Sequence, residues 1–260
     1  MKLGGFGKIA DYDKIRHAGY DYAELDMPEI EALSEEALDQ FVQHIQDCGF
    51  PVQVGSRILP VTEPIIFRPG FSAKKLESYV RSSCRKNRKV GISKILFGNG
   101  KARWLTDDES LQREQQFVDF MKMLCEAAGE NSQTVLIEPL GPKYSNYLNT
   151  VPEVLEAVEK IHMLNLSVMA DLRHFVWSGE SFEDIEKYHE RIGHYHIDFP
   201  LSWPERNYPS VDDGYNYQAF LNRVKQADNP ELTMTIEADI PEDWDQAFRE
   251  ADALLGKYWR

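Results

Sequence analysis

The sequence predicts an α/β protein built as a closed barrel of eight parallel strands, the (β/α)8 or TIM barrel. Short apolar runs alternate eight times with longer segments of helical periodicity, and the 260 residues are the size of such a barrel. The apolar runs lack a polar face, as expected for a parallel sheet covered by helices. An open doubly wound sheet is the main alternative, but it would carry a Gly-rich fingerprint after its first strand. The segment GGFGK matches that fingerprint only weakly and lies too close to the N-terminus. No linker or low-complexity stretch interrupts the pattern, so we expect one domain over residues 1–260.

The first four strand–helix units occupy the first half of the chain. Strands are expected at 2–8, 21–27, 51–58 and 92–100, and helices at 11–20, 33–49, 72–87 and 110–130. The helix at 33–49 is the best defined, because Ser34 suits its N-cap and Gly49 suits its end. One face of it is apolar: Ala37, Leu38, Phe41, Val42 and Ile45.

The second half repeats the scheme. Strands are expected at 134–140, 166–174, 194–199 and 232–239, and helices at 150–165, 181–193, 216–227 and 241–260. Pro241 suits the first turn of the closing helix.

Composition and charge limit the classes of partner and the cellular compartment that are expected for this protein. The formal net charge of −14 argues against a protein that grips nucleic acid through Lys and Arg. Three cysteines (Cys48, Cys84 and Cys125) show no paired spacing, which indicates a reducing compartment. The N-terminus has no apolar segment of signal-peptide length, and no window approaches a membrane span. We therefore expect a cytoplasmic protein with no nucleic-acid or membrane partner, and leave homo-oligomerisation open.

Polar residues end the four apolar runs of the second half. Glu138 follows VLI, Asp171 follows SVMA, His196 follows GHY and Glu237 follows TMTI, at separations of 33, 25 and 41 residues. Each separation is one strand–helix unit, so in a barrel the four side chains stand together at the carboxyl ends of neighbouring strands, where such barrels carry their active sites. Three carboxylates and one imidazole suit Mn²⁺, Mg²⁺, Co²⁺ or Zn²⁺, and a cation would offset their mutual repulsion.

Each residue alone has a simpler interpretation. A single acid after a strand usually caps the next helix, and a single histidine such as His194 is usually a packed or surface residue. Four residues of ligand type at four successive strand ends favour a metal site instead.

Four motifs carry a family resemblance: VLIEPL, MADLRHF, HYHIDFP…R and MTIEAD. They resemble the ligand motifs of the xylose isomerase-like barrel superfamily, and most nearly its sugar phosphate isomerase/epimerases and its ketose 3-epimerases of the tagatose epimerase type. LFGNGKAR and VDDGYNYQAFLNRV are similar to that family as well. The resemblance runs from about Asp21 to the last helix.

The resemblance implies roles for individual residues. Glu138, Asp171, His196 and Glu237 would bind one divalent metal, commonly Mn²⁺ in such enzymes. His174 matches a histidine that contacts substrate oxygen. Arg206 matches an arginine found soon after the ligand histidine, although here it follows a longer loop. Tyr144 stands where ketose epimerases usually have a second Glu that meets the substrate, which leaves the substrate open.

The predicted function is a divalent-metal-dependent sugar epimerase or isomerase. The metal would coordinate a ketose carbonyl, and Glu138 and Glu237 would act as base and acid on the neighbouring C–H through an enediolate. Trp203 is expected to pack against the sugar, because sugar faces pack well on rings. Glu24, at the end of the second strand, is expected either to hydrogen-bond substrate hydroxyls or to cap a helix.

Three alternatives remain open. A dehydratase of the inosose or dehydroshikimate type would use the same metal and base but expel a hydroxyl. An enzyme like endonuclease IV would need further histidines at strand ends in the first half, and ELDM, GSRILP and FGNG offer none. A non-catalytic sugar-binding protein is the third. No cluster of Lys and Arg in the sequence indicates a phosphate site, which favours a free sugar or polyol.

Overall fold

Eight parallel strands close into a barrel in sequence order, β1 to β8, so the predicted fold class is confirmed. The computed structural model describes residues 1–60, 64–226 and 232–258. β8 pairs with β1 through Thr233 opposite Lys2 and Ile236 opposite Gly5, which closes the cylinder. The strands are β1 (Lys2–Gly7), β2 (Tyr22–Asp26), β3 (Val52–Ser56), β4 (Lys94–Phe97), β5 (Thr134–Ile137), β6 (Leu166–Asp171), β7 (Ile192–Ile197) and β8 (Thr233–Ile236).

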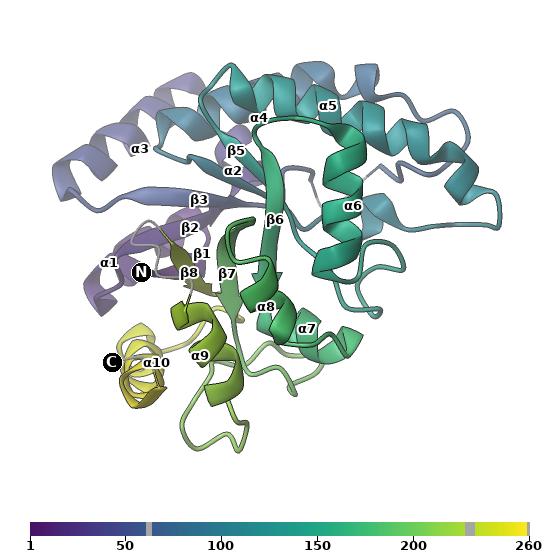
Figure 1. Cartoon of the computed structure of the whole chain (residues 1–260). Helices are drawn as coiled ribbons and strands as arrows, with labels where there is room; N and C mark the ends of the chain where they lie inside the picture. The colour runs from purple at the N-terminus through teal and green to yellow at the C-terminus, as the bar shows by residue number, and fades with distance from the viewer. Residues whose placement is uncertain (61–63, 227–231, 259–260) are drawn as a thin grey trace.

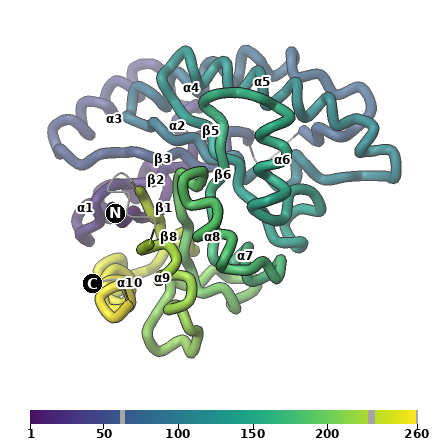
Figure 2. Tube along the Cα trace, viewed as in Figure 1, coloured from purple at the N-terminus to yellow at the C-terminus, as the bar shows by residue number. Residues whose placement is uncertain are grey.

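Helices cover the outside of the barrel, and α10 lies beside α1 so that the ring of helices closes (Figures 1 and 2). The helices are α1 (Tyr12–Ala18), α2 (Met27–Glu31), α3 (Glu35–Cys48), α4 (Glu77–Lys89), α5 (Glu114–Gly129), α6 (Val151–Ile161), α7 (Leu172–Ser178), α8 (Glu183–Lys187), α9 (Gln218–Gln226) and α10 (Trp244–Tyr258). Within the described part of the chain, no helix is long and apolar enough to cross a bilayer.

The caps predicted for the helix at 33–49 are confirmed. Ser34 Oγ accepts a hydrogen bond from the backbone N–H of Ala37 at 3.2 Å. Gly49 ends the helix with φ +63°, a left-handed conformation that glycine adopts without a steric penalty.

Several predicted boundaries are wrong. The helix expected at 181–193 is only α8, and β7 already begins at Ile192. The strand expected at 166–174 ends at Asp171, because that carboxylate caps α7 by accepting the backbone N–H of Arg173 at 2.7 Å. The closing helix begins at Trp244 rather than at Pro241. α2 was not predicted. The expected helical residues Ala227, Trp259 and Arg260 lie outside the described residues.

Alternation along the strands decides which side chains fill the barrel. Tyr22, Val54, Leu96, Leu136 and Met169 form a separate apolar cluster, one residue from each of β2 to β6. Successive side chains of a strand point to opposite faces, so the residue two positions later points inward again, one layer nearer the carboxyl end. That layer contains Glu24, Ser56, Gly98, Glu138 and Asp171.

Candidate metal and active site

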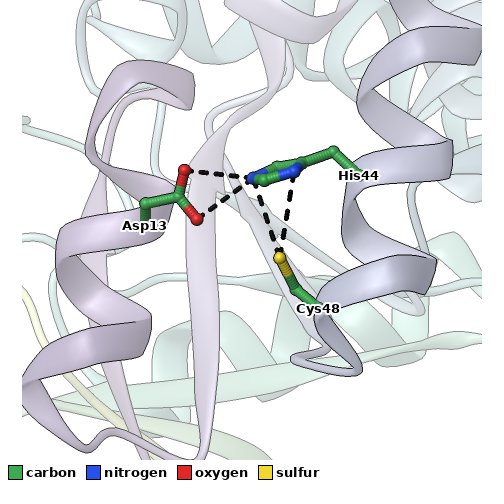
Figure 3. A group of neighbouring side chains, drawn as sticks. All are labelled: Asp13, His44 and Cys48. Atoms are coloured by element: carbon green, nitrogen blue, oxygen red, sulfur yellow. Dashed lines mark hydrogen bonds and ion pairs between the residues drawn. The ribbon is translucent and has the colours of Figure 1, made fainter.

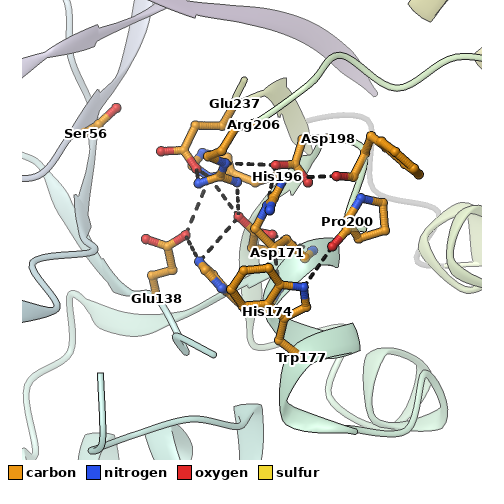
Figure 4. A network of polar contacts seen from close by, with 12 residues as sticks. Ser56, Glu138, Asp171, His174, Trp177, His196, Asp198, Pro200, Arg206 and Glu237 are labelled. Atoms are coloured by element: carbon orange, nitrogen blue, oxygen red, sulfur yellow. Dashed lines mark hydrogen bonds and ion pairs between the residues drawn. The ribbon is translucent and has the colours of Figure 1, made fainter. Parts of the chain in front are cut away.

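Four side chains converge at the carboxyl end of the barrel (Figure 4). Glu138 follows β5, Asp171 ends β6, His196 lies in β7 and Glu237 follows β8, and one ligand atom from each lies within 4.8 Å of the others. The backbone N–H of Glu138 still bonds Phe97 O of β4 at 3.3 Å, and that of Glu237 bonds Ile197 O of β7 at 3.2 Å. The sheet therefore extends to both acids and fixes their inward direction.

The atoms at the centre of this group suit a divalent cation. His196 Nδ1 lies 3.6 Å from Glu138 Oε1, 3.7 Å from Asp171 Oδ2 and 3.1 Å from Glu237 Oε2. Two of these buried atoms, Glu138 Oε1 and His196 Nδ1, have no hydrogen-bond partner among the described residues. Buried polar atoms are rarely left in that state unless an ion or water completes them. An oxygen and nitrogen donor set of this kind matches Mn²⁺, Mg²⁺, Co²⁺ and Zn²⁺.

Gly98 leaves the space that Glu138 occupies. A Cβ at Gly98 would lie 2.0 Å from Glu138 Oε2, so any side chain at this position would displace the carboxylate.

Glu24 lies beneath His196 and is fully buried inside the barrel. Its oxygens are 3.1 and 3.2 Å from His196 Nε2, 3.2 Å from His194 Nε2 and 2.6 Å from Ser56 Oγ, which donates to it. Burial opposes ionisation, but His196 and His194 hold the pKa of Glu24 well below its ordinary value. Glu24 is not among the residues that line the cavity described below, and its carboxylate faces the imidazole of His196, which a partner of this kind orients.

The hydrogen bonds continue from Glu24 through the barrel interior. His194 Nδ1 lies 2.7 Å from Thr233 Oγ1, and Lys94 Nζ donates to the same hydroxyl at 2.9 Å. A polar chain thus joins His196 to the amino-terminal end of the barrel. His194 is a member of this chain.

Arg206 lies against three of the acids at the site. Its guanidinium is 3.0 Å from Asp171 Oδ2, 2.5 Å from Glu237 Oε2 and 2.8 Å from Asp198 Oδ2. Asp198 also accepts Arg173 Nε at 2.6 Å, and Arg173 is fully buried. The longer loop before Arg206 therefore still brings it to Asp171 and Glu237, two of the candidate ligands.

The surroundings set the protonation of each acid and imidazole. Burial, together with the charges of Glu237 and Asp171, raises the pKa of Glu138 to about 7. Burial also lowers the pKa of His174 to about 4, so this imidazole is neutral at pH 7. Its Nε2 lies 3.6 Å from Glu138 Oε1 and 3.7 Å from Asp171 Oδ2. For Glu237, burial is outweighed by Arg206 and His196, and its pKa is lowered.

A cavity of about 470 Å³ opens onto two of the four candidate ligands, Glu138 and Glu237. Glu138, His174, Arg206 and Glu237 line its floor, and Tyr144 lines its wall. Trp203 is half exposed and packs edge-on against Trp177, with ring centroids 5.1 Å apart, rather than lining the cavity directly. A larger cavity of about 640 Å³ lies at the opposite end of the barrel, and its lining includes none of the acidic, histidine or cysteine side chains that bind metals.

Other residues of the site carried no recognisable signal in the sequence. Arg173 lies in MADLRHF and Asp198 in HYHIDFP, but only the fold shows that Arg173 binds Asp198 and that Asp198 binds Arg206. Gly98 lies in FGNG, where the sequence does not show that the carboxylate of Glu138 needs the space a glycine leaves.

A second group of ligand-type residues lies outside the barrel, on α1 and α3 (Figure 3). His44 Nε2 is 3.0 Å from both carboxylate oxygens of Asp13, and Cys48 Sγ is 3.8 Å from the same ring. The side chains of His44 and Asp13 are 45% and 49% exposed, so this is a hydrogen-bonded pair on the surface with a neighbouring thiol.

The family profile of the xylose isomerase-like TIM barrel matches residues 12–257. The chain belongs to this family. A search of curated protein sequences finds no match.

Solved structures of similar fold include several sugar enzymes. One is the 3-keto-D-glucoside 4-epimerase YcjR from E. coli, with 15% identity, 99% of each chain covered and a TM-score of 0.79. Another is the D-allulose 3-epimerase from Methylomonas sp. in complex with D-allulose, with 15% identity, 100% of this chain and 97% of the other covered and a TM-score of 0.82. The IolI protein with a bound zinc atom has 18% identity, coverage of 100% and 99% and a TM-score of 0.78. At these identities the likeness establishes the shared barrel.

Proposed function

We propose that this protein is a divalent-metal-dependent epimerase or isomerase of a sugar. One observation carries the proposal: Glu138, Asp171, His196 and Glu237 present ligand atoms within 4.8 Å of one another at the carboxyl ends of four successive strands. The sugar epimerases of similar fold, and the zinc in the IolI structure, support it. Mn²⁺ is the first candidate for the cation, with Mg²⁺, Co²⁺ and Zn²⁺ as alternatives.

Glu138 and Glu237 are suited to proton transfer. They come from β5 and β8, with the ligands of β6 and β7 between them, so they reach a substrate from two sides. When bound, a divalent cation supplies the electrophile that stabilises negative charge on substrate oxygen. One carboxylate takes the proton from the carbon beside the carbonyl and the other returns a proton to the opposite face, which inverts that carbon. Return of the proton to the neighbouring carbon gives aldose–ketose isomerisation instead.

Three further residues serve the substrate in this proposal. The neutral imidazole of His174 lines the cavity, and its Nδ1 has no hydrogen-bond partner among the described residues, so it is free to bond a substrate oxygen. Arg206 holds Asp171 and Glu237 in their ionised forms. Trp203 supports the aromatic wall behind Tyr144, their ring centroids 5.7 Å apart. Glu24 acts through His196 and does not touch the substrate.

The test combines metal analysis with solvent exchange. The protein is loaded with Mn²⁺, and a panel of ketoses is screened in deuterated water for exchange of a C–H beside the carbonyl. We expect exchange with at least one ketose, and its loss in Glu237→Gln. Glu242→Gln, an exposed acid outside the site, is the matched control and keeps exchange. Metal content is measured in each variant, because Glu237 is also a proposed ligand.

Absence of bound metal and of any response to Mn²⁺ would refute the proposal and favour a non-catalytic binding protein. Full exchange in Glu237→Gln would refute its role in proton transfer. An unsaturated or deoxy product in place of a stereoisomer would identify a dehydratase on the same scaffold.

A further inference from the structure

Basic side chains from three separate loops gather at the cavity above the ligands. Arg57 follows β3, Lys101 follows β4 and Lys143 follows β5, and all three line the same 470 Å³ cavity. They are far apart in the sequence, which is why the sequence alone showed no cluster. The protein as a whole is strongly acidic, with a formal net charge of −14. Screening limits the reach of distant charges to about 10 Å at 0.1 M salt, so the charges that line the cavity, and not the net charge, set the potential there.

Lys143 is held in place without being neutralised. Its Nζ lies 4.2 Å from the centroid of the Trp177 ring and 4.6 Å from that of Trp203. Trp177 is itself fixed, because its Nε1 donates to Pro200 O at 2.8 Å. It also packs closely against Gly141, where an added Cβ would lie only 2.9 Å from the Cβ of Trp177. Indole faces attract an ammonium without removing its charge. Among the described residues no carboxylate lies within ion-pair distance of Lys143 or Lys101.

Arg57 is oriented in a similar way. Its Nε bonds Asp26 Oδ1 at 2.7 Å, which leaves the terminal N–H groups for another partner. Its backbone has φ +39°, a conformation that non-glycine residues seldom adopt and that often marks a functional position.

Tyr144 stands in place of an acid that would repel an anion in this cavity. This is the position at which the resemblance leads one to expect a Glu that meets the substrate. The phenol ring stacks on Trp177 with centroids 5.5 Å apart and packs edge-on against His174 at 5.0 Å. A carboxylate beside Lys143 would pair with its ammonium and repel an incoming anion, whereas the phenol does neither.

We propose that the substrate carries an anionic group, a carboxylate or a phosphate, that Lys143 and Lys101 bind at the cavity while the reacting carbons face the metal ligands. Arg57 completes this anion subsite with its terminal N–H groups. The proposal rests on the proposed function for the position of the reacting end. It reverses the expectation of a free sugar that the sequence favoured.

The test measures binding, so its outcome is separate from that of the exchange assay. The Mn²⁺-loaded full chain is titrated by calorimetry with D-fructose, D-fructose 6-phosphate and D-fructuronate, which differ at the terminal carbon. We expect at least one anion to bind about tenfold more tightly than D-fructose, the gain typical of a hydrogen-bonded charge pair. The two anions separate phosphate from carboxylate as the recognised group.

Variants assign the preference to the subsite. Lys143→Met and Lys101→Met should each reduce the ratio of anion to D-fructose affinity severalfold, and Lys143→Arg should largely keep it. Lys122→Met removes an equal charge from exposed α5 and should leave the ratio unchanged. Raising the salt concentration should also lower the ratio.

The proposal is overturned if both anions bind no more tightly than D-fructose, if none of the three binds, or if the preference survives in Lys143→Met. Anion-selective binding without C–H exchange in any ketose would leave the subsite standing and refute the proposed reaction.

Discussion

Replacing Glu24 by Gln tests whether a buried carboxylate that touches no substrate controls the metal site. The change keeps the size of the side chain but removes the charge that faces His196 Nε2 at 3.1 and 3.2 Å. Without that charge the ring is held less firmly with Nδ1 toward Asp171 and Glu237, and it becomes a weaker donor to a cation. Partners of this kind typically change metal affinity by about 10–100-fold, or roughly 1.4–2.7 kcal/mol.

The assay is competition for Mn²⁺ between the protein and a fluorescent chelator, which needs no substrate. Glu138→Gln, which removes a proposed ligand, sets the upper end of the scale. Ser56→Ala is the matched control, because it deletes one hydrogen bond to Glu24 and leaves the carboxylate charged. We expect Glu24→Gln to lie between the two. If the Mn²⁺ affinity of Glu24→Gln lies within about twofold of that of the unaltered protein, with circular dichroism unchanged, Glu24 only occupies space in the barrel and does not affect the metal site.

Three further predictions concern metal binding and stability. Gly98→Ala should weaken Mn²⁺ binding more than Glu24→Gln does in the chelator assay, because its Cβ would lie 2.0 Å from Glu138 Oε2; unchanged affinity would exclude Glu138 as a ligand. Burial opposes protonation of His196, but Glu24 and Glu237 raise its pKa well above the ordinary value, so the metal-free site holds a proton that the cation must displace. Mn²⁺ affinity should therefore rise with pH, and calorimetry in two buffers of different ionisation enthalpy should detect a released proton; no release would contradict this. Burial raises the pKa of Glu180 to about 8 from 4.5, so the folded state binds that proton more tightly and loses stability as pH rises across this range. Glu180→Gln keeps an acceptor for Val151 N–H and should raise stability above pH 8 by about 1–2 kcal/mol after solvent screening, with the gain vanishing near pH 4 in thermal unfolding; a constant gain would contradict this account.

The ligand positions were predictable because a strand repeats every two residues. Leu136 points into the barrel, so Glu138 does too, and one strand–helix unit separates it from Asp171. The hydrophobic runs and the residues that end them are visible in the sequence itself, so the positions of the candidate ligands can be predicted without knowledge of tertiary contacts. The closed barrel follows from the same eight repeats.

The remaining features depend on contacts that sequence spacing does not encode. Glu24 points into the barrel by the alternation of β2, but only the folded barrel shows that its carboxylate reaches His194 and His196 of β7. Lys143 and Arg57 line one cavity only because the loops after β5 and β3 lie at the same end of the barrel. The start of β7 was missed because Gly193 resembles the glycine that commonly ends a helix, whereas in the structure Ile192 already pairs with Val168 of β6.

The polar chain from Lys94 through Thr233, His194 and Glu24 to His196 has a consequence for anyone redesigning this scaffold. Aliphatic side chains are the usual choice for the middle of a barrel, and they would make this one tighter. Here they would also remove the hydrogen bonds that orient the imidazole of His196. Substitutions that raise the stability of the fold at these few positions would therefore lower the affinity for the metal. Stabilised variants are better sought on the exposed faces of helices such as α3 and α5, away from this chain of hydrogen bonds.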